Sequence, residues 1–313
     1  MMTRLQQILI GALAVQIALA ALVFWPRSDV VASGEPLLTD FDPANVAQLS
    51  FEDGTGELVQ FVREGDGWIL GDSGFPAISG SIVSLLDNLV LVESDRLVTQ
   101  TESSHRRLKV AEDDFQRLVK ATMADGSTRT LLVGNAPDAQ SAYVRIPNQA
   151  ETFITSMITL RDLNLAKSGW INPIYFTLPQ EEIEGVVIEN GVGLFEIAQQ
   201  GESWIFPGLQ AGEGLNDAGV NTLLGRISSV RMTAPLGQEE RVSYGLGDPA
   251  AVVSVRTPSG ISTLTIGPPD ENNEHVIKWS ESPYYVTVSS FAVASFVEAE
   301  RANFVVTPGE GGS

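Results

Sequence analysis

The sequence predicts an α+β fold: two tandem homologous domains of antiparallel sheet, each covered by one or two helices, behind a single N-terminal transmembrane helix. Three observations predict it: an uncharged apolar N-terminal run, alternating apolar strands bounded by turn residues, and an amphipathic helix that occurs twice. Residues 81–92 and 217–230 both place apolar residues at helical spacing, and Trp68 or Trp204 ends a short β-like run before each helix. One α+β unit is therefore expected to occur twice.

Chain length and composition exclude several classes of function. At 313 residues, the chain has room for two domains of ordinary size. Its formal net charge of −20 excludes nucleic acid as a partner, because the protein could not neutralise a run of phosphates. The same charge repels anionic lipid headgroups, so membrane contact must come from hydrophobic insertion. The absence of cysteine excludes disulfides, thiol catalysis and zinc–thiolate clusters.

The N-terminal segment carries the strongest single signal. Residues 5–25 hold no charge, and as a helix they reach about 31 Å, enough to cross the hydrocarbon core of a bilayer. Arg4 precedes this segment and an acidic remainder follows it, which predicts a single-pass protein of the cell (inner) membrane with its bulk outside the cytoplasm. Residues 1–27 are therefore interpreted as a cytoplasmic tip and anchor. A signal peptide cleaved near residues 18–20 is the alternative, and it also places the remainder outside the cytoplasm.

Behind the anchor we predict a linker, two repeats and a disordered tail. The expected bounds are residues 28–41 for the linker, 42–165 for the first repeat, 166–305 for the second and 306–313 for the tail. In the first repeat, Ser79 or Ser81 is the expected N-cap of the helix, and residues 152–163 are expected to close the unit as a helix or strand.

The second repeat follows the first in the same order, and a helix over residues 291–304 is expected to close it. The expected correspondences, first unit to second, are Val46, Leu49 and Phe51 with Ile183, Val186 and Ile188; Leu108 with Leu246; Gly134 with Gly267; and residues 143–146 with 285–288.

A set of structural markers runs through both units. The markers are Trp68, Trp170, Trp204, Gly134, Gly267, the element Tyr244, Gly245, Leu246, Gly247, Asp248, Pro249, the strand end Leu264–Gly267 and the pair Tyr285–Val286. With the N-terminal apolar helix, this layout resembles the bacterial family catalogued as domain of unknown function 4340. In the first unit, residues 105–110 replace the Tyr-Gly-Leu element. The resemblance implies an uncharacterised envelope protein. Some members are similar to the extracytoplasmic auxiliary part of ABC transporters of the gliding-motility type, which implies a transporter or another envelope complex as partner.

The two histidines carry little sign of chemistry. His105 follows two serines and precedes two arginines, so we expect a solvated turn in a basic surface loop. His275 ends residues 270–275, whose alternating oxygen donors resemble a calcium loop. That segment lacks the glycine and the distal glutamate that such a loop uses, so we expect an exposed acidic hairpin tip.

Clusters of carboxylates and glycines are the other candidates for a site. The carboxylate clusters are Glu112, Asp113 and Asp114 in the first unit and Glu181, Glu182 and Glu184 in the second, but a chain with 39 acidic residues is expected to contain such clusters. The glycines of residues 208–214 lack the lysine of a phosphate-binding loop. We therefore assign no catalytic residue, no cofactor and no metal ligand.

The tryptophans are expected to be structural. Trp68 and Trp204 should lie in the cores, and Trp170 should pack between the units, so that its loss would loosen them. The function that fits is a membrane-anchored, extracytoplasmic, non-enzymatic binding or scaffold module. A carboxylate-dependent envelope hydrolase and a soluble exported ligand-binding protein, released by signal cleavage, are the alternatives.

Overall fold

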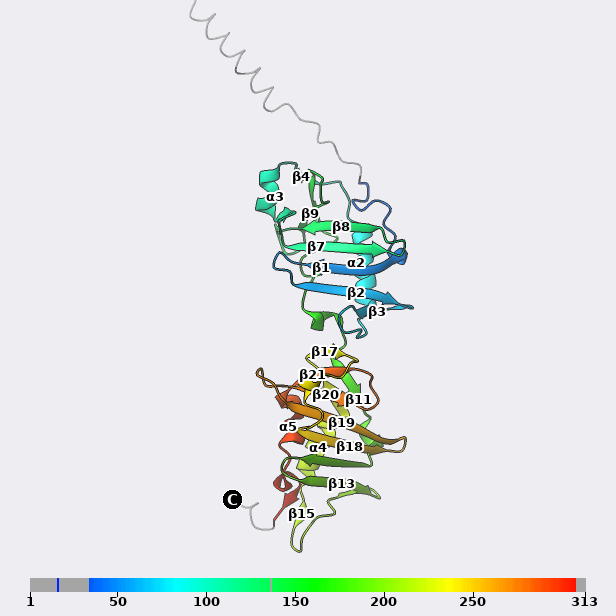
Figure 1. Ribbon diagram of the computed structural model, residues 1–313, viewed down its shortest axis with the longest axis vertical. Coiled ribbons are helices and arrows are strands. Elements are labelled where there is room, and N and C mark those ends of the chain that lie inside the picture. Colours follow the sequence, from blue (N-terminus) through cyan, green and yellow to red (C-terminus); the bar gives the residue numbers. More distant parts are fainter. Residues whose placement is uncertain (1–15, 17–33, 136, 308–313) are drawn as a thin grey trace, which may run out of the picture.

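The computed structural model describes Gln16, residues 34–135 and residues 137–307. In this part the chain is mostly antiparallel sheet with four α-helices, which confirms the predicted α+β class. Two eight-stranded sheets follow one another along the long axis of the molecule (Figure 1). No helix within these ranges is long and apolar enough to cross a membrane. The predicted anchor, residues 5–25, lies outside the described residues apart from Gln16.

The first unit is built on a sheet with the strand order β3-β2-β1-β7-β8-β9-β10-β4. The strands are β1 (Val46–Glu52), β2 (Leu58–Glu64), β3 (Gly67–Leu70), β4 (Leu97–Thr99), β7 (Arg117–Met123), β8 (Thr128–Val133), β9 (Ala142–Arg145) and β10 (Thr152–Thr155). Alternate residues of the central strands are buried, because one face of the sheet packs against helix α2 (Ser79–Val90). The apolar stripe of α2 is buried as its spacing predicts, through Ile82, Leu85, Leu86 and Leu89.

The other face of the first sheet is partly covered by two small elements. Helix α3 (Glu102–Leu108) leads into a hairpin of β5 (Val110–Ala111) and β6 (Asp114–Phe115). Leu108, Val110 and Leu132 form a second, small core beneath them. The first unit therefore buries apolar side chains on both faces of its sheet, but on the second face only locally.

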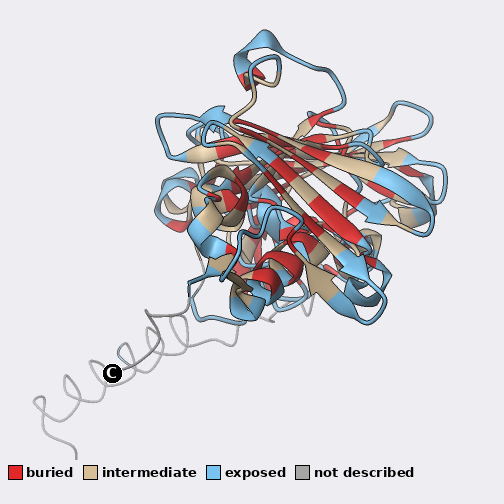
Figure 2. Ribbon diagram, turned by 90° about the horizontal axis from the view of Figure 1, so that it is seen from below, coloured by how far each residue is buried: buried red, intermediate tan, exposed pale blue. Residues whose placement is uncertain are grey.

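The second unit repeats this plan with the strand order β14-β13-β12-β18-β19-β20-β21-β17. Its strands are β12 (Gly185–Asn190), β13 (Leu194–Gln200), β14 (Ser203–Ile205), β17 (Ala234–Gly237), β18 (Ala251–Thr257), β19 (Gly260–Pro269), β20 (Glu274–Trp279) and β21 (Tyr285–Ser289). Helices α4 (Asp217–Ser228) and α5 (Ser290–Val297) pack on one face. Figure 2 shows the buried residues along the strands and helices and the exposed residues at the strand ends and loops.

Short elements complete both units. They are the 3-10 turns η1 (Pro43–Asn45), η2 (Lys167–Trp170), η3 (Gln180–Glu182), η4 (Val242–Tyr244) and η5 (Arg301–Asn303), and the two-stranded pairs of β11 (Ile174–Thr177) with β16 (Ser229–Arg231) and of β15 (Gly214–Leu215) with β22 (Val305–Val306).

Strand register relates the two units residue by residue. Leu49 lies opposite Phe61 and Ala121, and Val186 lies opposite Ile197 and Val255, in the equivalent strands. The correspondence predicted for the first strand of each unit is thus confirmed. The two repeat-matched tryptophans also occupy equivalent positions, because Trp68 lies opposite Arg63 and Trp204 opposite Gln199, each two residues beyond the partner of Leu49 or Val186. Trp68 is buried in the core as predicted, whereas Trp204 is only partly buried and packs against the core from its margin.

Two predicted correspondences are wrong. Strand β21 takes the place of β10, so residues 285–288 correspond to 152–155 and not to 143–146. Both segments begin with Tyr-Val, but this likeness does not place them at equivalent positions. The position of a strand in a sheet depends on which strands it pairs with. Likewise Leu108 corresponds to Tyr244 and not to Leu246. A Cβ at Gly134 would overlap the backbone oxygen of Leu108, and one at Gly267 that of Tyr244.

The residues that follow these two carbonyls support the corrected alignment. Lys109 and Gly245 are both in the left-handed region, with φ of 60° and 67°. Glycine adopts this conformation without steric cost, which explains the Tyr-Gly-Leu element of the second unit.

The helix ends differ from the predicted ones. Ile78 is the N-cap of α2 and makes no side-chain cap, whereas the hydroxyl of Ser79 accepts the backbone N–H of Trp68 at 3.1 Å. In the second unit Asn216 caps α4 by accepting the N–H of Gly219. The predicted closing helix over residues 291–304 ends at Val297, as α5.

The described part of the predicted linker packs on the first unit. Leu38 is buried in the core, and the N–H of Leu37 donates to the carbonyl of Val92 at 2.7 Å. Arg129 donates to the carbonyls of Thr39 and Asp40. Residues 37–40 therefore form a strap held against the first sheet.

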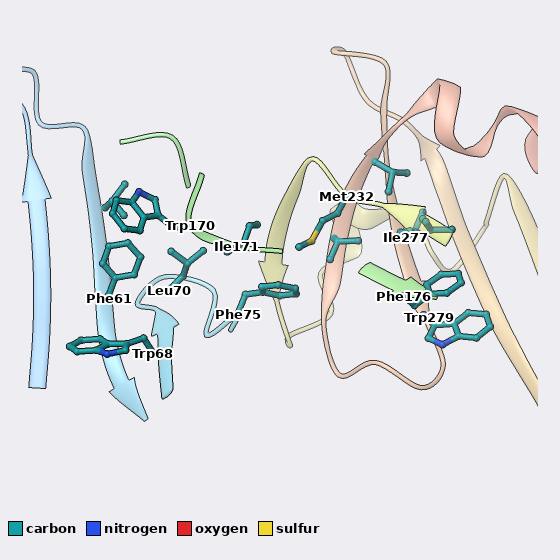
Figure 3. Close-up of a cluster of buried hydrophobic side chains, with 14 of the residues drawn as sticks. Phe61, Trp68, Leu70, Phe75, Trp170, Ile171, Phe176, Met232, Ile277 and Trp279 are labelled. Atoms are coloured by element: carbon teal, nitrogen blue, oxygen red, sulfur yellow. The ribbon is translucent and has the colours of Figure 1, made fainter. Parts of the chain in front are cut away.

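Each unit is closed by an aromatic residue from the segment after its last large strand. The carbonyl of Trp170 accepts the N–H of Ile78 at 2.7 Å, and the carbonyl of Phe304 accepts the N–H of Asn216 at 2.9 Å. The ring of Trp170 lies 5.1 Å from that of Phe61, inside the first unit (Figure 3). Trp170 was expected between the units; it fills the first core instead, in the place that Phe304 takes in the second.

The junction between the units is a small aromatic contact. The ring of Phe75, in the loop after β3, meets Tyr284 edge to face at 4.8 Å, and the Tyr284 hydroxyl donates to the carbonyl of Gly74 at 2.9 Å. The buried side chains of both units form one continuous cluster across this contact (Figure 3). Strands β3 and β17 face each other here but belong to separate sheets (Figure 1).

Replacing Phe75 with alanine should uncouple the two units. The loss of a buried ring leaves a cavity at the junction, which costs about 3–5 kcal/mol. In scanning calorimetry we expect one unfolding transition for the wild type and two for Phe75→Ala. Phe291→Ala, at a side chain that is 72% exposed, is the control and should keep one transition. A single transition in both variants would contradict the coupling.

Replacing Gly134 or Gly267 with alanine should destabilise the unit that contains it, by about 1–3 kcal/mol, because the new methyl group overlaps a backbone oxygen. Gly225→Ala on helix α4, where a Cβ meets nothing within 4 Å, should stabilise by about 0.5–1 kcal/mol. Urea unfolding measures all three. Equal stability of Gly134→Ala and the wild type would show that the close approach is wrong.

Candidate functional site

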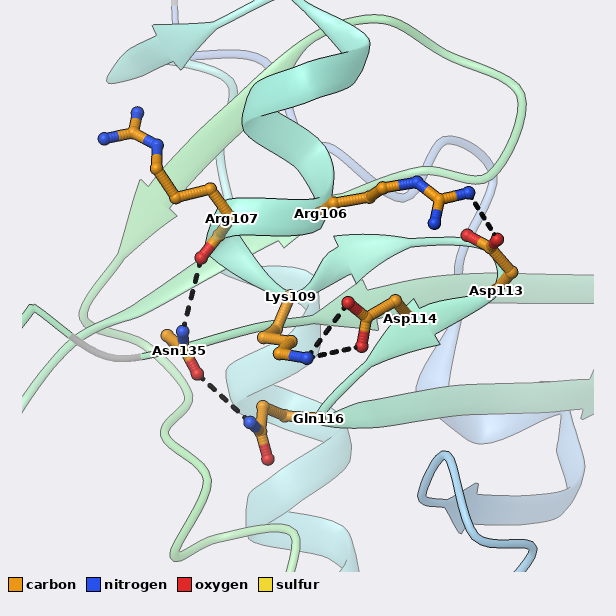
Figure 4. Close-up of polar contacts among 7 residues, drawn as sticks. All are labelled: Arg106, Arg107, Lys109, Asp113, Asp114, Gln116 and Asn135. Carbon is orange, nitrogen blue, oxygen red and sulfur yellow. Dashed lines mark hydrogen bonds and ion pairs between the residues drawn. The ribbon is translucent and has the colours of Figure 1, made fainter.

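Three of the five ion pairs among the described residues lie around the β5–β6 hairpin of the first unit, which holds the first acidic cluster of the sequence. Asp113 pairs with Arg106 at 2.6 Å, and Asp114 pairs with Lys109 at 2.7 Å (Figure 4). Glu112 lies 3.5 Å from Arg145. Each carboxylate therefore faces a different cation, and the three do not converge on one point as an acid–base pair requires.

Polar contacts behind the hairpin tie it to the sheet. Gln116 donates its amide to Asn135, and Asn135 donates to the backbone carbonyl of Arg107 (Figure 4). The pair of Arg106 and Asp113 is mostly exposed on both sides, and such a pair contributes about 0.2–1 kcal/mol. This network positions the hairpin on the sheet but contributes little to the free energy of folding.

Arg145 is the buried cation of this region, with a side chain only 5% exposed. Its Nε donates to the carbonyl of Val110 at 2.7 Å, and its Nη1 donates to the carbonyl of Gln149 at 2.6 Å. The guanidinium thus ties the β5 strand to the β9–β10 loop.

Lys278 has the same place in the second unit. Arg145 lies opposite Leu132 and Thr152, and Lys278 lies opposite Thr265 and Tyr285 in the equivalent strands. The Lys278 ammonium group donates to the carbonyls of Trp279 and Ser282, the latter in the β20–β21 loop. Sequence reasoning missed both cations. The signal in the sequence is a cation near the end of an apolar strand in each hairpin, and the equivalence of the two positions depends on how β9 and β20 pair with their neighbours.

Both histidines are buried, which corrects their predicted exposure. His105 lies on helix α3, not in a turn, and its Nε2 is 2.8 Å from the carbonyl of Ala150. His275 lies in strand β20, with its Nδ1 2.8 Å from the carbonyl of Gly267. Because a carbonyl only accepts, the nitrogen that faces it carries the proton. Each imidazole therefore fastens a loop or strand to its neighbour.

The other candidates have structural contacts or lie exposed. One carboxylate oxygen of Asp270 accepts the N–H groups of Asn272 and Glu274, both at 2.8 Å, which makes a turn and not an ion-binding loop. The acidic side chains of residues 181–184 are exposed. In the glycine loop of residues 208–214, the carbonyl of Gly208 accepts from Arg301. Within residues 34–135 and 137–307, no group of three His, Asp or Glu side chains could hold a metal ion.

Two hollows lie beside the hairpin, and Glu112 lines both. One, of about 600 Å³, is polar and includes His105, Arg106 and Arg145. The other, of about 530 Å³, is mostly apolar and includes Leu37, Leu118 and Ile146. Volumes of this size are typical of ligand sites. We call the apolar hollow the β8 groove; it is lined by Leu37, Leu38, Thr39, Glu112, Leu118, Thr128, Arg129, Thr130, Leu132, Ile146, Pro147 and Gln149.

Comparison with known proteins gives one match. A family model described as "Domain of unknown function (DUF4340)" matches residues 68–249, more than half of the chain. The match begins at Trp68 and ends at Pro249, which are two of the structural markers named in the sequence analysis. No curated protein and no solved structure matches the chain.

The half-buried ammonium group of Lys278 should give stability a pH dependence. Burial lowers the pKa of the Lys278 ammonium group from its ordinary value of 10.5. Between the lowered pKa and 10.5 the unfolded chain holds more protons than the folded one, so the free energy of unfolding rises with pH across that window. Lys278→Met should remove this rise.

Urea midpoints of the wild type and Lys278→Met, taken from pH 8 to pH 10.5, measure the effect as their difference, which cancels the titration of groups remote from Lys278. Lys120→Met, at an exposed position on the first sheet, controls for the loss of one positive charge. A difference between wild type and Lys278→Met that stays constant over this range would contradict the desolvation of Lys278.

Proposed function

The chain belongs to the DUF4340 family, and from that premise we propose that it is a membrane-anchored, extracytoplasmic, non-enzymatic binding or scaffold module of the cell envelope. Its partner is a protein complex. The chain serves as an auxiliary part of an ABC-type transporter or of another envelope assembly. Residues 5–25 hold it in the inner membrane, with the N-terminus in the cytoplasm.

The observation that carries the proposal is that the side chains suited to catalysis each have a separate partner and do not converge on one point. Three adjacent carboxylates, residues 112–114, face three different cations, and both histidines bond to backbone carbonyls. A hydrolase that works through two carboxylates needs them about 5–10 Å apart around one substrate bond. Figure 4 shows two of these carboxylates, Asp113 and Asp114, each paired with its own cation.

The shape of the molecule supports a role in spacing and contact. The segment that opens the range of residues 34–135, blue in Figure 1, lies at the end of the first unit that is remote from the second. A chain anchored ahead of Gly34 holds its second unit farthest from the bilayer. The net charge of −20 repels anionic headgroups and favours an orientation away from the membrane surface.

The test is affinity purification of the full-length protein from its own membranes in mild detergent, read by mass spectrometry with intact-mass analysis. We expect specific envelope proteins in stoichiometric amount and a chain that retains residues 1–27. The Phe75→Ala variant is compared in parallel, because a scaffold that spans both units should lose partners when the units uncouple. A protein that purifies alone from the membrane fraction, or a mature chain that begins after residue 20, would contradict the proposal.

A further inference from the structure

Strand β8 of the first unit has an edge that its neighbour leaves unpaired. Strand β9 pairs with β8 only through Leu132 with Arg145 and Val133 with Val144. Beyond Arg145 the chain leaves the sheet at Ile146 and Pro147. The remaining residues of β8, back to Thr128, therefore have β7 on one side and no strand on the other.

The alternation of hydrogen bonds shows which groups face the gap. At the hairpin turn the N–H of Met123 donates to the carbonyl of Ser127, and at the other end the N–H of Gly134 donates to Tyr143 on β9. Since the direction alternates along a strand, the N–H and C=O of Thr130 point away from β7. Neither group has a hydrogen-bond partner within residues 34–135 and 137–307.

The second unit shows the same position with both groups satisfied. Thr263 lies opposite Ser254 as Thr130 lies opposite Lys120. The N–H of Ser280 donates to the carbonyl of Thr263 at 2.9 Å, and the Ser280 hydroxyl accepts the N–H of Thr263 at 3.0 Å. One residue therefore closes the edge of the second sheet at this point.

In the first unit Pro147 is the residue equivalent to Ser280. The register sets Arg145 against Lys278, so the residue two positions later is Pro147 in one unit and Ser280 in the other. Proline has no N–H and no hydroxyl, so it offers neither of the two bonds. Pairing in the first unit ends at Arg145, whereas in the second unit Trp279 still pairs with Leu264 and Ser280 adds its two bonds. Pro147 thus lies where the second unit has the residue that closes the edge.

The β8 groove lies along this edge, with a volume of about 530 Å³. Its walls include the strap at Leu37 and the departing chain at Ile146 and Pro147. The charged groups at its margin are already bound: Arg129 donates to the carbonyls of Thr39, Thr128 and Asp40, and Glu112 accepts the N–H of Asn148. What the groove offers a ligand is an apolar wall together with the backbone donor and acceptor of Thr130.

We propose that the β8 groove binds a short, extended, uncharged peptide segment of a partner protein, which adds to β8 as a strand and bonds the backbone of Thr130. An extended peptide satisfies a free donor and acceptor together, whereas an acyl chain leaves both unpaired. The proposal deepens the proposed function and rests on it, because it names the kind of segment by which a partner docks.

The experiment uses the full chain in lipid nanodiscs and a fluorescein-labelled hexapeptide of alternating threonine and valine, with empty nanodiscs as the blank. Fluorescence anisotropy should show saturable binding to the wild type. Pro147→Ser supplies the N–H and hydroxyl that close the edge in the second unit, and should weaken binding at least tenfold. Ser280→Ala, the matched change in the second unit, should leave the affinity unchanged.

A second variant and a second peptide test whether binding takes place in the groove and by strand pairing. Thr128→Trp, at an exposed position on the groove wall, narrows the groove without touching the core and should also weaken binding. The same peptide with alternate amides N-methylated should bind at least tenfold more weakly, because it cannot pair with a strand. Equal binding of both peptides, equal binding by Pro147→Ser, or no binding at millimolar peptide would overturn the proposal.

The two proposals fail in different ways. If envelope proteins copurify with both the wild type and Pro147→Ser, and the peptide fails these tests, the scaffold role stands and the groove is not its docking site. If no protein copurifies while the peptide binds as expected, the groove is a strand-binding site and the envelope assembly is wrong.

Discussion

One backbone hydrogen bond closes each unit, and the packing of both cores depends on it. The N-cap amide of the covering helix, at Ile78 or Asn216, donates to the carbonyl of an aromatic residue, Trp170 or Phe304, that arrives from beyond the last large strand. A helix N-terminus has unpaired N–H groups, so this bond satisfies one of them while it seats the ring. Trp170 then meets Phe61, and Phe304 meets Phe195 and Phe206. Without the returning segment, helix and sheet would leave their shared edge open to water.

Much of the fold could be predicted from the sequence, because it depends on local pattern. Helical spacing identified the buried stripe of α2, and strand alternation identified the central strands. The same alternation gave the correct correspondence of Val46 with Ile183. The family resemblance is confirmed by the matching family model. What failed depends on pairing between distant strands: the sequence likeness of residues 143–146 and 285–288 concealed that β21 stands in the place of β10. The burial of His105 and His275 was missed because the bonded carbonyls come from other segments. No signal in the sequence could have shown these partners.

The two units share a plan but differ in what they leave open. In the second, Ser280 completes the pairing of β19, and helix α5 adds a cover that the first unit lacks. In the first, a charged hairpin occupies part of the outer face, and Pro147 leaves β8 unpaired beside an apolar groove. A duplicated unit must keep the contacts that hold its core, whereas its edges are free to diverge. The strand register relates residues of the first unit to residues of the second, so a difference such as Pro147 against Ser280 is located at equivalent positions. The charged hairpin and the β8 groove therefore both lie on the first unit.

The central claim is that each unit is closed by its own returning aromatic residue, so that the first unit is complete only when it includes Trp170. Comparing two fragments, residues 34–171 and residues 34–165, by thermal unfolding and amide NMR dispersion tests this most directly. The account predicts cooperative unfolding and dispersed amide signals for the longer fragment. It predicts neither for the shorter one, which lacks Trp170 although it ends at the boundary drawn from the sequence. Equal folding of both fragments would contradict the claim, and so would failure of the longer fragment to fold without the second unit.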